Sequence, residues 1–297
     1  MQLDYTSLAG LLAAAEQAGR PLSELVLAQQ AAELEQPPEQ VYDRMDRCYQ
    51  VMADGVAPGC DPDLRSASGL SGGSAAKMKA AVEAGRTLTG PVLSGALTRA
   101  LAISELNAAM GRIVAAPTAG SCGILPAALL TMEREKGCSR RSCVMAMFTA
   151  SAVGLVIAKN ACLAGAQGGC QAECGSAAAM AAAAIVELAG GTPKMIGDAV
   201  AIALKNVLGL VCDPVAGLVE VPCVKRNAAG VAGAFVAAEL ALAGIGSVIP
   251  PDEAVLAMKR VGDAMHPALK ETAEGGLAAT PTACRLQHEL LGRDAWQ

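Results

Sequence analysis

Residues 208–227, LGLVCDPVAGLVEVPCVKRN, hold two cysteines, Cys212 and Cys223, eleven residues apart in a stretch with almost no helical periodicity. An Asp-Pro pair follows the first cysteine, and a proline directly precedes the second. Because a proline biases the residue before it away from the helical region, both cysteines should border extended backbone. The stretch predicts a rigid loop that presents two thiols toward one point, then a helix starting near Asn227. Taken alone, the pair could equally be small core side chains, as most free cysteines are.

A third cysteine, Cys170, lies in the glycine-rich segment AQGGCQAECGS at 166–176. We expect a helix from about Gln171, and the dipole at a helix start lowers the pKa of a thiol, which suits a metal ligand. Cys174 lies one helical turn further on and is interpreted as a core residue. Glu173 is a carboxylate in an otherwise neutral segment and should need a partner.

Together these motifs resemble the iron–sulfur-dependent L-serine dehydratases, and more closely the separate alpha (catalytic) subunit of the two-chain bacterial form. The resemblance rests on GGCQAECGSA, LGLVCDPVAGLVEVPC and VKRN, and runs from about residue 40 nearly to the end. Further matching stretches are SGLSGG (68–73), NAAMGRIVAAPTAGS (107–121), MAAAAIVELAGGTP (180–193) and EGGLAATPT (274–282).

The resemblance implies that Cys170, Cys212 and Cys223 bind a [4Fe–4S] cluster. A cluster with three protein thiolates has one open iron, which can act as a Lewis acid on a substrate hydroxyl. A base then removes the Cα proton of L-serine, and elimination gives an enamine that becomes pyruvate and ammonia. The resemblance also implies a place in amino-acid degradation and gluconeogenesis, and chemistry without pyridoxal phosphate.

The general base is not identified by the sequence. The candidates within the chain are Glu173, Lys225 and Asp213. The two histidines, His266 and His288, are interpreted as surface residues. The two-chain form has a beta subunit with a Ser-Ser-His-Thr segment, so the resemblance implies that a partner chain can supply the missing histidine.

Two Ser/Thr/Gly-rich helix entries are candidates for binding the substrate carboxylate, because free N–H groups at a helix start attract anions. One runs into a helix starting near Ser74, and the other, 117–123, into a helix from Ile124. Plain helix caps on loops are the alternative. With the resemblance, the substrate-binding candidates are Ser68, Ser71, Gly72, Gly73, Thr118 and Ser121.

The remaining cysteines receive other interpretations. Cys122 and Cys284 are alternative ligands of the fourth iron, although both also fit ordinary turn or surface positions. Cys48 and Cys143 lie within expected helices, and Cys138 lies in a basic turn. These three are interpreted as structural.

Composition favours an all-α fold in a compact helical domain, and the resemblance implies that its loops carry the cluster. The 297 residues are 53% hydrophobic but only 2% aromatic, so small aliphatic side chains must fill the core. We expect a single catalytic domain over 1–297, with N-terminal helices in 1–57 and a cluster-binding core in 58–297. The tail after 280 has few apolar anchors and should be partly loose.

Charge and patterning exclude several classes of protein. A net charge of −5 and few aromatic residues argue against nucleic-acid binding. The N-terminus lacks a signal-peptide pattern, and the longest charge-free run, seventeen residues over 142–158, is short for a membrane span and is expected to be a buried helix. Eleven cysteines without a signal indicate a reducing cytoplasm. We expect no membrane association and an oligomer.

Two other functions stay open at this point. The chain could be an iron–sulfur redox sensor or electron carrier, which would need a fourth fixed thiolate. It could also be a helical scaffold whose cysteines all lie in the core. A pyridoxal enzyme is disfavoured, because no lysine sits in a convincing Schiff-base setting.

Overall fold

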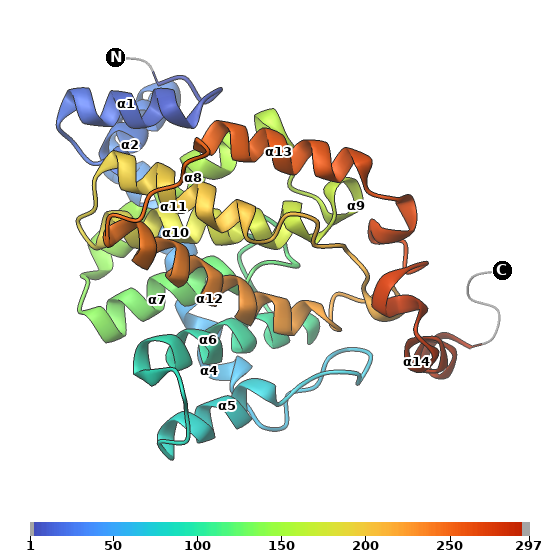
Figure 1. Cartoon of the computed structure of the whole chain (residues 1–297). Coiled ribbons are helices and arrows are strands. Elements are labelled where there is room, and N and C mark those ends of the chain that lie inside the picture. The colour runs from blue at the N-terminus through green and yellow to red at the C-terminus, as the bar shows by residue number, and fades with distance from the viewer. Residues whose placement is uncertain (1–2, 293–297) are drawn as a thin grey trace.

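The computed structural model of the chain describes residues 3–292, which form a helical bundle without a strand in that range, so the all-α prediction is confirmed (Figure 1). The α-helices are α1 (Leu8–Ala18), α2 (Leu22–Glu33), α3 (Pro38–Asp54), α4 (Val56–Gly59), α5 (Ser74–Glu83), α6 (Gly90–Ala108), α7 (Ile124–Lys136), α8 (Arg140–Asn160), α9 (Gly165–Gly168), α10 (Ser176–Leu188), α11 (Pro193–Lys205), α12 (Cys223–Leu242), α13 (Pro251–Ala264) and α14 (Pro281–Leu291). A π-helical turn, η1 (Gln171–Gly175), precedes α10, and 3₁₀ turns are η2 (Val215–Gly217), η3 (Pro267–Leu269) and η4 (Gly276–Ala279).

Helix α10 is the centre of the bundle and packs against α7, α8, α11 and α12. Every residue from Ser176 to Val186 is buried, and most of them are alanines. Side chains this small let neighbouring helices approach closely, since the distance between helix axes depends on the residues at the contact. The low aromatic content of the chain is therefore consistent with a core in which closely packed helices leave room mainly for small side chains.

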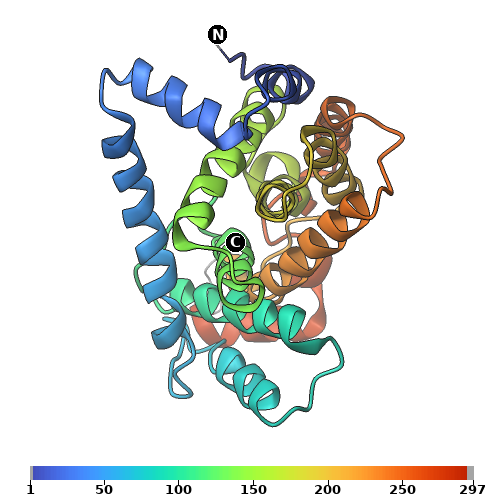
Figure 2. The same cartoon turned by 90° about the vertical axis from the view of Figure 1, so that its left-hand side faces the viewer.

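The N-terminal helices run along the top and one side of the bundle (Figure 2). Ser7 caps α1, and Asp252 on α13 accepts hydrogen bonds from Leu8 N at 2.7 Å and Ser7 Oγ at 2.9 Å. Buried apolar side chains from residue 3 to residue 258 form one continuous cluster. The N-terminal helices therefore share their core with the rest of the chain.

Helix α8 contains the long charge-free run. By length and composition it could cross a membrane, but 67% of its most apolar window is buried inside the protein. It packs against α10 and α2, so the predicted buried helix is confirmed.

Two predicted boundaries differ from the structure. Helix α12 begins at Cys223, four residues before the predicted start at Asn227, because the backbone becomes helical directly after Pro222. The segment expected to be loose after 280 forms α14, which Thr280 caps by accepting a hydrogen bond from Ala283 N. Residues 293–297 of that expected tail lie outside the described residues.

Candidate functional site

Cys170 lies between a sharp glycine turn and the π-helical turn η1. Gly169 has φ +75°, and a Cβ there would lie 2.7 Å from Met265 Cε and 2.8 Å from Leu210 O. The buried Gln171 follows: its amide Nε2 donates to Gly168 O and Met258 O, and its Oε1 accepts from Gly209 N at 2.9 Å. Gln171 therefore ties the Cys170 turn to the segment leading to Cys212.

Cys212 is bonded on both sides by a later segment, 265–280, which we call the strap. Cys212 N donates to Leu269 O at 2.9 Å, and Glu271 N donates to Cys212 O at 2.7 Å. Glu271 adopts a left-handed φ of +64°, which is uncommon outside glycine and asparagine. The strap thereby brings the Glu271 carboxylate near Cys212. Both groups lie beside Gly165, because a Cβ added to Gly165 would be 2.8 Å from Cys212 Sγ and 3.3 Å from Glu271 Oε2.

Cys223 is the first residue of α12, and the buried Asn227 one turn later joins it to the 117–123 loop. The Asn227 Nδ2 donates to Gly120 O at 2.7 Å and to Cys223 O at 3.0 Å, while its Oδ1 accepts from Gly123 N at 2.9 Å. A buried amide with all these bonds made is a strong positional constraint. It holds the second predicted substrate loop against the start of α12.

The three predicted ligands share one buried electrostatic neighbourhood. Cys170, Cys212 and Cys223 are 2%, 4% and 6% exposed. Burial, and next the charge of Cys170, raise the pKa of Cys212 well above its usual range and that of Cys223 to about 12. The pKa of Cys170 is lowered, first by a hydrogen bond from Cys174 and also by the Arg226 cation. Their assignment as ligands stays a prediction.

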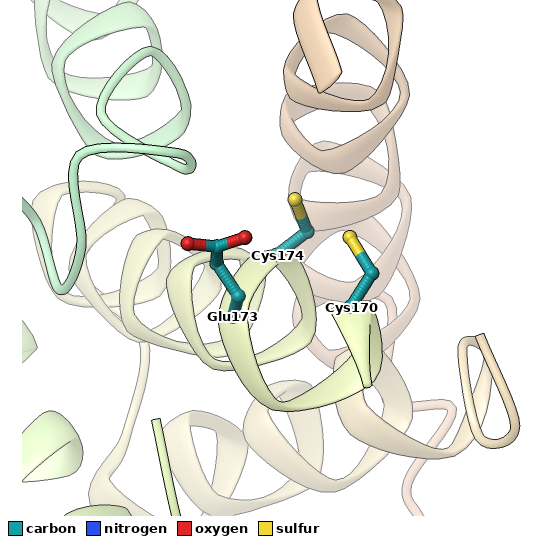
Figure 3. Close-up of side chains that lie close together, drawn as sticks. All are labelled: Cys170, Glu173 and Cys174. Atoms are coloured by element: carbon teal, nitrogen blue, oxygen red, sulfur yellow. The ribbon is translucent and has the colours of Figure 1, made fainter. Parts of the chain in front are cut away.

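Cys174 is buried, as the core interpretation required, but it also faces the site. The ligand atoms of Cys170, Glu173 and Cys174 lie within 4.8 Å of one another. Figure 3 shows the three side chains rising from the same side of the turn. Cys212 and Cys223 do not join this tight group.

Glu173 connects the cysteines to the 117–121 loop. The Thr118 hydroxyl donates to Glu173 Oε1 and also lies 2.9 Å from Ser121 Oγ. Burial raises the pKa of Glu173, the Thr118 hydrogen bond lowers it, and the Glu271 charge raises it. The partner that the sequence analysis expected for this carboxylate is Thr118.

The other two base candidates are placed differently. Asp213 is 3% exposed and forms an ion pair with Arg226 at 2.9 Å. Its second oxygen accepts from Leu277 N at 2.7 Å, which attaches the strap. Lys225 is exposed on the first turn of α12. Asp213 thus has a structural role, whereas Glu173 is hydrogen-bonded to Thr118 of the predicted substrate loop 117–121.

The loop 68–73 lies next to the loop between the two cysteines, but its hydroxyls already have a partner. Ser68 Oγ and Ser71 Oγ donate to the buried Glu220 carboxylate at 2.7 and 2.6 Å. Gly72 has φ +137°, and a Cβ there would lie 2.2 Å from Leu64 O, so only glycine fits this turn; the neighbouring Gly73 has φ +75°.

The helix start near Ser74 was expected to offer free N–H groups to an anion, and this expectation is wrong. The Ser74 and Ala75 amides at the start of α5 donate to the Glu105 carboxylate at 2.9 and 3.0 Å. Glu105 is 1% exposed. The positive end of this helix is therefore neutralised by a side chain of the chain itself, and binding of a substrate carboxylate by these residues stays a prediction without that support.

The remaining cysteines and histidines lie outside this group. Cys122 is fully buried with Sγ 3.9 Å from Ile103 O, and burial raises its pKa to about 12. Cys284 is exposed on α14. His266 caps η3 by accepting from Ala268 N, and His288 is exposed.

Four positioning residues were missed by the sequence analysis: Gln171, Glu220, Arg226 and Asn227. Each is a polar side chain in a mostly apolar or glycine-rich stretch, and each is buried or half-buried. That contrast is the only signal the sequence offers, because a buried polar group must find a partner.

The chain is similar to proteins of one family along most of its length. A family model described as serine dehydratase alpha chain matches residues 17–278. A probable L-serine dehydratase alpha chain of Bacillus subtilis is 50% identical over 271 residues, which cover 91% of this chain and 90% of the relative. The L-serine dehydratase alpha chain of Peptoniphilus asaccharolyticus is 42% identical over 273 residues, 92% of this chain and 94% of the relative. L-serine dehydratase 2 of Escherichia coli is 36% identical over 291 residues, 94% of this chain and 62% of the relative. The chain therefore belongs to the serine dehydratase alpha chain family.

Proposed function

We propose that the chain deaminates L-serine to pyruvate and ammonia, and that Cys170, Cys212 and Cys223 hold the [4Fe–4S] cluster this requires. The observation that carries the proposal is that these three buried thiols, from segments far apart in the sequence, act electrostatically on one another, and that Cys170 and Cys223 also interact with the Arg226 charge. Thiolate donors are the ligands such clusters take, and a nearby cation offsets their charge. When bound, the cluster would supply an open iron as Lewis acid for the substrate hydroxyl.

The residues of the chain would bind the substrate and move its proton. Glu173 is our candidate for accepting the Cα proton, because it lies beside the thiols and is oriented by Thr118. Ser121 and the amides of its loop would hold the carboxylate. Catalysis by a positioned carboxylate needs this kind of fixed geometry first and a suitable pKa second.

A partner chain is part of the proposal. Two relatives are named as alpha chains, which implies a second chain. Leu208 and Leu277 are 38% and 45% exposed on the segments that flank Cys212 and Asp213, and they would offer apolar contacts to a partner. All eleven cysteines are free, which supports a reducing, cytoplasmic setting for this complex.

The test is anaerobic reconstitution of the purified chain with iron and sulfide, followed by a pyruvate assay with L-serine, with and without the partner chain. We expect a brown protein that bleaches in air and loses turnover as it bleaches. A brown protein that never turns over L-serine, even with its partner, would favour the electron-carrier alternative. A colourless protein would contradict both.

A further inference from the structure

One turn of the chain carries three side chains of the types that bind metals, and two of the three are not among the proposed cluster ligands. Cys170, Glu173 and Cys174 follow a Cys-x-x-Glu-Cys spacing, which places all three on one helical face. Their ligand atoms lie within 4.8 Å of one another; Cys170 directly precedes the turn η1, and Glu173 and Cys174 lie within it (Figure 3). Only Cys170 belongs to the proposed cluster ligands.

The carboxylate of this group is already oriented. The Thr118 hydroxyl donates to Glu173 Oε1. Carboxylates that bind metals are commonly held by such an outer hydrogen bond, which fixes the direction of the remaining oxygen. Both cysteines are at least 96% buried, whereas Glu173 is partly exposed.

The charge around the group favours a cation. Two thiols and a carboxylate share a mostly buried space; a metal binds the thiols as thiolates, and the cation then offsets a buried negative charge that would be costly unpaired. The Arg226 cation beside Cys170 is shared with Asp213, with which it forms an ion pair at 2.9 Å, so it offsets only part of this charge. A divalent ion would balance the group more directly.

We propose that Cys170, Glu173 and Cys174 bind a single thiophilic divalent ion, of the class of Zn²⁺, in the chain that lacks its cluster. Two sulfurs and one oxygen form three corners of a tetrahedron, and water takes the fourth, as in open zinc sites. Because Cys170 belongs to both sites, the single ion and the cluster exclude each other. This exclusion rests on the proposed function, whereas binding of the single ion does not.

The first experiment titrates the cluster-free chain with Co²⁺ under reducing, anaerobic conditions and follows the thiolate-to-cobalt absorption band. We expect one ion per chain. Cys174→Ala and Glu173→Gln should each weaken binding by more than the ~10–100-fold typical of losing an outer-shell partner. Cys212→Ala and Cys143→Ala are matched controls that should bind Co²⁺ as the wild type does, with helicity by circular dichroism verifying that every variant is folded.

The opposite pattern would overturn the proposal. Wild-type affinity in Cys174→Ala, or loss of the band in Cys212→Ala, would assign the ion to a different set of residues.

The second experiment tests the exclusion. The chain is loaded with one equivalent of Zn²⁺ before iron and sulfide are added, and bound iron is measured. Zinc should block iron uptake in the wild type but not in Cys174→Ala; equal uptake with and without zinc in the wild type would contradict the exclusion. If the wild type takes up no cluster even without zinc, the proposed function fails while the cobalt titration still reports on the single-ion site.

Discussion

Glu173 is the residue at which the cysteine group and the 117–121 loop meet. Its carboxylate is within 4.8 Å of two thiols and accepts a hydrogen bond from Thr118. Burial favours its neutral form and the Thr118 hydroxyl favours its charged form. The state of this carboxylate therefore depends on one hydroxyl from a distant segment.

Thr118→Val tests that dependence. The hydroxyl lowers the pKa of Glu173, so its removal should raise the pKa further and keep the carboxyl protonated to higher pH. If Glu173 accepts the substrate proton, the acid limb of the kcat/KM profile should move to higher pH and turnover at neutral pH should fall. Thr118→Ser keeps the hydroxyl and should keep the wild-type profile. An unchanged acid limb in Thr118→Val would remove Glu173 from this role.

The proposed cluster ligands are tested by single alanine substitutions. Cys170→Ala, Cys212→Ala and Cys223→Ala should each prevent stable cluster assembly and abolish pyruvate formation. Cys143→Ala is the control, since Cys143 is fully buried within α8 and its loss should cost on the order of 1 kcal/mol of stability. Iron and sulfide per chain are measured after anaerobic reconstitution; four irons and full activity in Cys212→Ala would refute the assignment.

At the scale of the elements, short connections are held in place by buried polar side chains from elsewhere in the chain. Asn227 on α12 satisfies Gly120 O and Gly123 N, Glu105 on α6 caps α5, and Gln171 bonds Gly209 N. These partners are 30 or more residues away in sequence. The helices of the chain were predictable from local periodicity and punctuation, but these connections were not.

The anion site predicted at the start of α5 shows why these connections could not be predicted from local sequence. Local sequence correctly indicated a glycine-rich helix entry with free amides, and helix starts do attract anions. The anion that binds there is Glu105, thirty-one residues after Ser74. The predicted start of α12 was wrong for a related reason. The turn that ends at Pro222 is stabilised by a hydrogen bond from Val215 N to Val221 O at 2.8 Å, and a helical periodicity in the sequence does not indicate such a bond.

Asn227→Ala tests the tie between α12 and the 117–123 loop. It leaves the Gly123 N–H and the Gly120 carbonyl without this partner. Each unsatisfied buried group costs roughly 1–3 kcal/mol, so we expect a loss of about 2–6 kcal/mol in the free energy of unfolding. Asn107→Ala is matched, because Asn107 makes a single, exposed hydrogen bond to Ala119 O of the same loop. Urea denaturation should show a much smaller loss for Asn107→Ala, and equal losses would contradict the tie.

At the scale of the whole molecule, the bundle is organised by the alanine-rich α10. Its residues Ala181–Ala184 are completely buried between four other helices. Composition alone predicted this helical class, since a core with few aromatic side chains must be filled by small ones. What composition does not reveal is which of the helices lies at the centre.

Ala182→Leu should therefore destabilise the protein strongly. Added methylenes in a filled core cost typically ~1–3 kcal/mol, whereas an exposed helical site changes stability by about 0.5 kcal/mol or less. Ala13→Leu on the exposed side of α1 is the control. Thermal unfolding should separate the two variants by several degrees, and a wild-type Tm for Ala182→Leu would mean that α10 is not tightly packed.

The bonds made by Gln171 and Asn227 have a consequence for how a cofactor is acquired. Small metal-dependent domains lose chain entropy when the metal binds, because their ligands are disordered beforehand. Here both amides fix the backbone around Cys170 and Cys223 through the polypeptide itself. That entropy is lost when the chain folds, so a cluster held by these cysteines, as we propose, would bind to an already ordered site, and its removal should leave the helical bundle folded.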